Sequence, residues 1–295
     1  MAQKIVSQSY WKPILLKDEH PKGGGSTIAG YENILLVSDL DGTLLDSEQQ
    51  ISEENQRAIT EFKKSGGIFT IATGRMEQAA LPFAELLKID VPIILYNGAV
   101  LYHPKSHSRI AEKSLDGYGE LLEAFQTIME ETELGLLIYQ NGGVYTTQKN
   151  ETIRQHEEKD QVECQLITNP AVLKGPITKI LLISSDRKTL AKCEEIVKLR
   201  GYPCGLVYSE HNYLEILPEG ASKGSALLHL QDYLNHDFTT VCVGDNLNDL
   251  PMLEEAARGF IVGNCHSSLT DYKFNQTVHH EEHAIADIIY NHIFQ

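Results

Sequence analysis

Short apolar runs alternate with amphipathic segments from residue 31 onward, and this alternation constrains the fold more than any other feature of the sequence. The run Ile34-Leu35-Leu36-Val37-Ser38 ends in a polar turn that contains glycine, which is typical of a buried parallel strand. Ser52 is an N-cap candidate that predicts a helix after it. Further elements follow as a strand, a helix and a strand at 68–72, 76–87 and 92–96. The alternation predicts an α/β fold with a doubly wound parallel sheet, built from right-handed βαβ units.

The pattern changes in the middle of the chain. The extended runs 205–209 and 213–217 are separated by three residues, which is hairpin spacing and requires antiparallel pairing. Residues 102–209 are therefore predicted to form an inserted α+β domain. The α/β alternation then resumes with a helix, a strand and a helix at 222–235, 239–244 and 250–257. The two parts of the core domain are thus expected at 31–101 and 210–295.

Composition excludes several classes of protein. The 295 residues carry a net charge of −16, a field that repels polyanions, so nucleic acid is not an expected partner. No segment reaches the ~18 consecutive apolar residues of a membrane span, and a signal-peptide pattern is lacking. The five cysteines include no C-x-x-C pair, which is typical of reduced thiols, so we expect a cytoplasmic protein without a membrane partner. Residues 1–30, with the glycine-rich stretch 22–26, are interpreted as an N-terminal appendage or linker.

Polar groups follow the predicted strands at four places, and open parallel sheets bind ligands at such strand ends. The first group is Asp39-Leu40-Asp41-Gly42-Thr43. Its two carboxylates can face the same side of one loop, where a cation or a shared proton would offset their repulsion. The second group is Thr73-Gly74-Arg75, whose hydroxyl, backbone N–H groups and guanidinium suit a phosphoryl group. Taken alone, each of these groups also fits an ordinary strand-end turn.

The other two groups lie later in the chain. Lys223, in Ser222-Lys223-Gly224, is predicted at the start of a helix, where the helix dipole disfavours its charge. The last group is Gly244-Asp245-Asn246-Leu247-Asn248-Asp249. Two acids and two amides in one turn indicate a site for a hard cation with oxygen ligands.

In this order the four groups resemble the motifs of the haloacid dehalogenase superfamily of phosphohydrolases. The matching positions are Asp39-x-Asp41-Gly42-Thr43, Thr73, Lys223 and Gly244-Asp245-x-x-Asn248-Asp249. The long insert, the stretch Tyr96-Asn97-Gly98-Ala99 and the segment from Leu214 to Gly224 are similar to the Cof-type subgroup. The resemblance covers nearly all of residues 31–290.

The resemblance implies a role for each matching residue. Asp39 would be the nucleophile that forms an aspartyl-phosphate, and Asp41 would be the general acid and base. A magnesium ion would be held by the Asp39 carboxylate, the main-chain carbonyl of Asp41, and Asp245. The residues implied to receive phosphoryl oxygens are Leu40, Thr73, Gly74, Lys223 and Asn248. Asp249 would support Lys223 or a metal-bound water.

The expected function is that of a magnesium-dependent phosphatase that hydrolyses small phosphorylated metabolites similar to sugar phosphates. The insert would be a cap that covers the site and supplies specificity contacts. A phosphotransferase or phosphomutase would use the same Asp39, and a catalytically idle protein that binds phosphometabolites as a regulator is a third interpretation. Arg75 is left with two roles, a substrate contact or an ion pair with a carboxylate.

Overall fold

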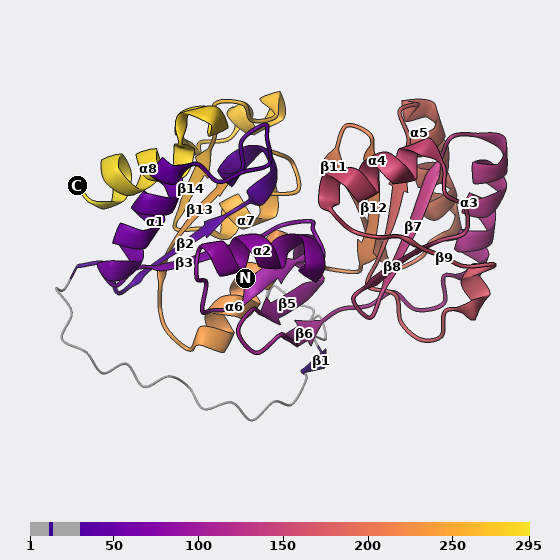
Figure 1. Cartoon of the computed structure of the whole chain (residues 1–295), viewed down its shortest axis with the longest axis horizontal. Helices are drawn as coiled ribbons and strands as arrows, with labels where there is room; N and C mark the ends of the chain where they lie inside the picture. The colour runs from indigo at the N-terminus through magenta and orange to yellow at the C-terminus, as the bar shows by residue number, and fades with distance from the viewer. Residues whose placement is uncertain (1–11, 14–29) are drawn as a thin grey trace, which may run out of the picture.

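The structure, a computed structural model, describes residues 12–13 and 30–295, and the strands in these residues form three sheets. The central sheet has five parallel strands in the order β15-β14-β13-β2-β3 (Figure 1). Its strands are β2 (Ile34–Ser38), β3 (Ile68–Ile71), β13 (Thr239–Gly244), β14 (Arg258–Ile261) and β15 (Asn275–Gln276). The predicted α/β class with a parallel sheet is confirmed.

Helices cover both faces of the central sheet. Successive residues of a strand point to opposite faces, and β2 shows the consequence. Leu36 belongs to the same apolar cluster as residues of α1 (Glu53–Lys64) and α8 (Ala284–Ile288). Leu35 and Val37 cluster with residues of α6 (Lys223–Leu234) and α7 (Leu250–Glu255). The sheet is therefore doubly wound, as the sequence predicts.

A second, antiparallel sheet extends the core beyond β3. Its order is β1-β6-β5-β4, and a parallel bridge between Ala72 and Ile94 joins it to the end of β3. Its strands are β1 (Lys12–Pro13), β4 (Ile93–Leu95), β5 (Val100–His103) and β6 (Ser108–Glu112). The helix α2 (Glu77–Leu86) connects β3 to β4. Most of the predicted appendage, namely residues 1–11 and 14–29, lies outside the described residues.

The third sheet has six strands in the order β11-β12-β10-β7-β8-β9. These are β7 (Gly135–Gln140), β8 (Gly143–Thr146), β9 (Gln165–Leu166), β10 (Lys179–Ile183), β11 (Cys204–Glu210) and β12 (Tyr213–Pro218). The helices α3 (Gly119–Glu131) and α5 (Arg187–Arg200) pack on one face of this sheet. Residues of the other face cluster with Ile153 of α4 (Glu151–Asp160) and with core residues. We call the six-stranded sheet with α3, α4 and α5 the cap, and the remainder the core (Figure 1).

The chain changes sheet at residues other than those that bound the predicted insert, 102–209. β5 and β6 pair with β4 in the core, so the chain leaves the core only after Glu112. β12 lies after residue 210 and nevertheless pairs with β10 and β11 of the cap. A tight turn between Glu210 and Tyr213 ties β12 to β11. All six residues of β12 are buried, so its apolar sequence does not indicate whether the strand belongs to the core sheet or to the cap sheet.

Short helical turns, free cysteines and the lengths of the helices complete the description of the fold. Short helical turns occur at η1 (Leu40–Leu44), η2 (Tyr96–Gly98), η3 (Pro170–Val172), η4 (Ser267–Asp271), η5 (His280–Glu282) and η6 (Ile289–Ile293). All five cysteines have free thiols, and Cys242 is buried in β13. Among the described helices, none combines the length and the apolar character that a membrane crossing requires.

Candidate active site

The candidate site lies where β2 and β13 end side by side. Asp39 follows β2 and Asp245 follows β13, and the two strands are neighbours in the sheet. The chain continues from β2 to α1 on one face and from β13 to α7 on the other. Such a divergence opens a crevice at the carboxyl edge of an open α/β sheet, which is the usual place for a ligand.

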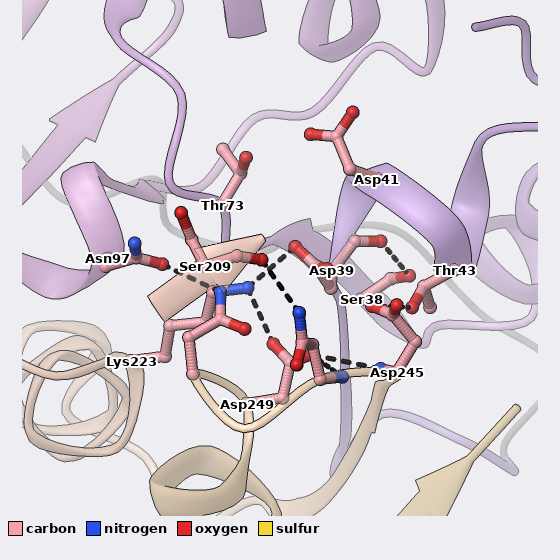
Figure 2. Close-up of polar contacts among 12 residues, drawn as sticks. Ser38, Asp39, Asp41, Thr43, Thr73, Asn97, Ser209, Lys223, Asp245 and Asp249 are labelled. Carbon is pink, nitrogen blue, oxygen red and sulfur yellow. Dashed lines mark hydrogen bonds and ion pairs between the residues drawn. The ribbon is translucent and has the colours of Figure 1, made fainter. Parts of the chain in front are cut away.

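Lys223 connects two buried carboxylates at the base of the site (Figure 2). Its Nζ donates to Asp39 Oδ1 at 2.7 Å and to Asp249 Oδ1 at 2.6 Å. Ser222 caps α6 by accepting the N–H of Ser225, so Lys223 is the first helical residue, as predicted. Burial alone would lower the pKa of Lys223, but the charges of Asp249 and Asp39 outweigh it and raise the pKa. The two carboxylates thus compensate a cation that the helix dipole disfavours.

The acidic groups of the site repel one another. Burial, together with the charge of Asp249, raises the pKa of Asp39 to about 7 although Lys223 opposes the shift. Burial and the charge of Asp39 also raise the pKa of Asp245 well above its ordinary value. Raised pKa values caused by burial and by neighbouring carboxylates mean that Asp39 and Asp245 are costly to ionise together unless a further positive charge is present.

The donor chemistry of this cluster fits a magnesium ion. Carboxylate oxygens of Asp39, Asp245 and Asp249 lie within 4.8 Å of one another. Both oxygens of Asp249 are already engaged, because Oδ1 accepts from Lys223 and Oδ2 accepts the N–H groups of Asp245 and Asn246 at 3.0 Å. Asp39 and Asp245 therefore remain as candidate ligands, and an all-oxygen donor set suits a hard dication. Of the two partners predicted for Asp249, Lys223 is the one that it contacts in the structure.

Asp41 lies in a different environment from Asp39. Its carboxylate accepts two hydrogen bonds from Arg75, from Nε at 2.9 Å and from a terminal nitrogen at 2.6 Å. Figure 2 shows the Asp41 side chain pointing away from the group around Asp39. Burial would raise the pKa of Asp41, but the hydrogen bonds and charge of Arg75 hold it below its ordinary value. Of the two roles open to Arg75, the structure shows the ion pair with a carboxylate.

The predicted phosphate-binding residues occupy two kinds of position. Gly74 and Asn248 line a cavity above Asp39. Thr73 is fully buried, and its Oγ1 accepts the N–H of Arg75 at 3.1 Å. The side chain of Leu40 packs in the apolar core, so only its backbone is available to a ligand. Lys223 is fully buried and does not border the cavity, but its Nζ bonds to Asp39, which does.

Sequence reasoning gave Asn97 no role, but the structure brings it against the site. Its Oδ1 accepts from Asn248 Nδ2 at 3.0 Å, and its backbone N–H donates to the carbonyl of Thr73 at 3.0 Å. The turn Tyr96-Asn97-Gly98 has three successive positive φ values, of 50°, 52° and 94°. Such backbone strain in non-glycine residues collects at functional sites. In the sequence, only the similarity of the stretch Tyr96-Asn97-Gly98-Ala99 to the Cof-type subgroup could have indicated that Asn97 lies at the site.

The cavity lies between the core and the cap and has a volume of about 270 Å³. Its core side includes Asp39, Asp41, Gly74, Arg75, Asp245 and Asn248, and its cap side includes His156, Lys159, Asp160, Lys179, Glu210, Tyr213 and Glu215. Two hydrogen bonds join the two sides: Lys179 Nζ donates to the carbonyl of Gly74 at 2.9 Å, and Asn246 Nδ2 donates to the carbonyl of Ser209 at 2.7 Å. Sequence reasoning identified none of the cap residues.

Known proteins share both the sequence pattern and the fold. The profile of the haloacid dehalogenase-like hydrolases matches residues 36–289. The phosphatase YwpJ of Bacillus subtilis is 27% identical over 287 residues, covering 86% of this chain and 98% of YwpJ. The pyridoxal phosphate phosphatase YbhA of Escherichia coli is 25% identical, covering 88% of this chain and 98% of YbhA. A solved haloacid dehalogenase-like hydrolase of B. subtilis aligns with a TM-score of 0.76 at 25% identity, covering 88% of this chain and 99% of its own.

A doubly wound α/β core with buried carboxylates at its strand ends and a cap above them, together with phosphatases as relatives, defines a hydrolase that acts on phosphate esters. The chain belongs to the haloacid dehalogenase-like hydrolases, and within them to the Cof type. The predicted family and enzyme class are therefore confirmed.

Proposed function

We propose that this protein is a magnesium-dependent phosphatase that hydrolyses small phosphorylated metabolites through an aspartyl-phosphate on Asp39. The observation that carries the proposal is the placement of the Asp39 carboxylate. The Asp39 side chain is 7% exposed, it borders the cavity, and one of its oxygens is held by Lys223. A nucleophile needs such a fixed orientation, and the positive charge of Lys223 favours a phosphoryl group beside it.

Hydrolysis would proceed in two displacements at phosphorus. An oxygen of Asp39 attacks phosphorus, the bond to the ester oxygen breaks, and Asp41 gives a proton to the departing alcohol. A water molecule then attacks the aspartyl-phosphate and passes a proton to Asp41, which releases phosphate and restores Asp39. Asp41 borders the same cavity, so its carboxylate would be within reach of the leaving group.

The metal and the phosphoryl oxygens would be shared among the core loops. Asp39, Asp245 and the carbonyl of Asp41 would hold magnesium, which when bound offsets the charge between nucleophile and phosphate. The groups that would receive phosphoryl oxygens are Lys223, Asn248, the Thr73 hydroxyl and the backbone N–H groups of Leu40 and Gly74. Asp249 would keep Lys223 in place.

The cavity supports a small substrate similar to a sugar phosphate. Its volume of about 270 Å³ lies just below the range of roughly 300–1,000 Å³ that is usual for ligand sites. The named phosphatases among the relatives, YwpJ and YbhA, agree with phosphate-ester substrates. The cap that closes this cavity would exclude water and contact the leaving group. A cytoplasmic location accords with the five free thiols.

The test is hydrolysis of p-nitrophenyl phosphate by the full chain with and without magnesium. Asp39→Asn should lower kcat by about a thousandfold or more, because loss of a nucleophile removes the covalent route. Asp116→Asn, an exposed residue with the same change of charge, is the matched control. Normal turnover by the Asp39 variant would refute the covalent mechanism.

A further inference from the structure

The cap side of the cavity is expected to decide which leaving groups fit. Its charged side chains are two lysines and three carboxylates, so one carboxylate has no lysine partner. Both lysines on this side pair with cap carboxylates. Lys179 lies 3.1 Å from Glu215, and Lys159 forms an ion pair with Glu210. Each pair is neutral as a whole, so neither lysine offers an uncompensated charge to an anionic group of a substrate.

Asp160 is the one carboxylate of the cap side, among the described residues, that has no such partner. No hydrogen bond from a described residue reaches it, and its only ion-pair neighbour within 4.0 Å is His156, whose Nε2 lies 3.8 Å away. That nitrogen is engaged by the hydroxyl of Tyr139 at 2.9 Å, and Nδ1 is engaged by the hydroxyl of Tyr213 at 3.1 Å. Burial and the charges of Lys179 and Lys159 lower the pKa of His156 to about 3, so its ring is neutral near neutral pH.

Asp160 also lies where a leaving group would be. It borders the cavity, and 14% of its side chain is exposed. Apart from burial, the strongest influences on its pKa are the charges of Arg75 and Asp41 on the core side. Arg75 and Asp41 border the same cavity from the core side, so Asp160 shares this cavity with the pair that would deliver a proton to the leaving oxygen. Asp160 is also the last residue of α4, and the negative end of a helix dipole adds to its charge.

We propose that Asp160 is a specificity-determining residue that selects the chemical class of the leaving group. Its carboxylate accepts hydrogen bonds from hydroxyl or ammonium groups and repels a carboxylate or a second phosphate. The preferred substrates are thus monoesters of polyols, sugars or amino alcohols, and phosphorylated acids and bisphosphates are disfavoured. This inference rests on the proposed phosphatase function and adds the choice of substrate.

The test compares two esters that differ in one group. Glycerol 3-phosphate carries a hydroxymethyl group where 3-phosphoglycerate carries a carboxylate. With magnesium, the wild-type chain should show a kcat/KM ratio of about ten or more in favour of glycerol 3-phosphate, since a repulsion of about 1.4 kcal/mol between two carboxylates is enough for a tenfold ratio. p-Nitrophenyl phosphate serves as the reference for phosphatase activity. If wild type hydrolyses none of the three esters, the proposed function itself fails.

Two variants should move this ratio in opposite directions. Asp160→Asn removes the charge and keeps an acceptor, so the ratio should fall about fivefold, chiefly through a lower KM for 3-phosphoglycerate. Lys159→Met leaves Glu210 uncompensated, so the ratio should rise by about the same factor. Glu163→Gln, an exposed cap carboxylate, is the control and should leave the ratio unchanged. If wild type is active and both cavity variants keep its ratio within about twofold, Asp160 does not set specificity.

Discussion

Arg75 holds the carboxylate of Asp41 through two hydrogen bonds, of 2.9 Å and 2.6 Å, and the Asp41 side chain points away from Asp39 (Figure 2). Two acids separated by one residue thereby acquire opposite properties. The pKa of Asp39 rises to about 7 through burial and the charge of Asp249, whereas Arg75 overcomes the effect of burial and lowers the pKa of Asp41. The lowered pKa of Asp41 suits the step in which it accepts a proton from the attacking water, and the raised pKa of Asp39 means that its ionised, nucleophilic form needs a further positive charge beside it.

The first prediction concerns this pair. Arg75→Met should lower kcat for an alkyl phosphate by about a hundredfold, because a poor leaving group depends on a positioned general acid. The loss for p-nitrophenyl phosphate should be about tenfold smaller, because nitrophenolate departs with little protonation. The measurement is the ratio of the two kcat values. Arg187→Met is the control, since this guanidinium lies over the ring of Tyr208 in the cap, 4.1 Å from its centroid. Equal losses for both substrates would mean that Arg75 acts on something other than Asp41.

The core of the site could be predicted because its signals are local. Asp39 and Asp245 each follow an apolar run, and parallel strands bring their carboxyl ends to one edge of the sheet. Lys223 directly follows Ser222, a typical N-cap residue, so its position at the start of a helix could be inferred from these two neighbouring residues. The structure adds the contacts of Lys223 with Asp39 and Asp249, which explain why the lysine tolerates that position.

The cap side of the cavity could not be predicted, because its residues gain their role only when cap and core meet. Lys179 lies in β10 and Glu215 in the neighbouring strand β12. In the sequence each is a single charged residue in an otherwise apolar run. Nothing in either run indicates that Lys179 reaches the carbonyl of Gly74, 105 residues away in the chain. His156 and Asp160 lie on a helix with many charges, where a solvated surface is the usual interpretation.

The second prediction concerns His156 and the pH dependence of stability. Its pKa of about 3 in the folded chain lies below the ordinary value, so the unfolded chain binds more protons between these two values. Stability contributed by the neutral ring is complete above about pH 6.5 and is lost as the pH falls toward 3. At about pH 5 the loss is about 2 kcal/mol. His156→Gln should remove this part of the loss in urea unfolding measured between about pH 7 and pH 5.

The control for this measurement is His211→Gln, an exposed histidine of the β11–β12 turn. It should leave the slope of the unfolding free energy against pH unchanged. A His156 variant with the slope of wild type would show that the buried ring does not titrate on unfolding.

The third prediction concerns the buried pair of Lys179 and Glu215, whose side chains are 4% and 3% exposed. Lys179→Met should lower the free energy of unfolding by about 3–5 kcal/mol, because it leaves Glu215 buried without its partner. The double variant with Glu215→Met should regain part of this loss, so a double-mutant cycle should give a coupling of about 1–3 kcal/mol. Lys149→Met, which breaks a more exposed cap pair with Glu157, should cost about 1 kcal/mol or less. Additive effects of the two buried substitutions would contradict a direct interaction.

The last prediction concerns magnesium and the repulsion between Asp39 and Asp245. Burial and neighbouring carboxylates raise the pKa of both groups, Asp249 acting on Asp39 and Asp39 acting on Asp245. Bound magnesium should therefore stabilise the fold, and should do so more at about pH 8 than at about pH 6, where protons compete for the ligands. At a concentration one hundred times its dissociation constant the gain is about 2.7 kcal/mol, readable as a rise in Tm. Asp245→Asn should abolish the rise. Without magnesium this variant should be at least as stable as wild type, because it removes a buried charge from beside Asp39. An Asp245 variant that is less stable without magnesium yet still responds to the ion would place the metal elsewhere.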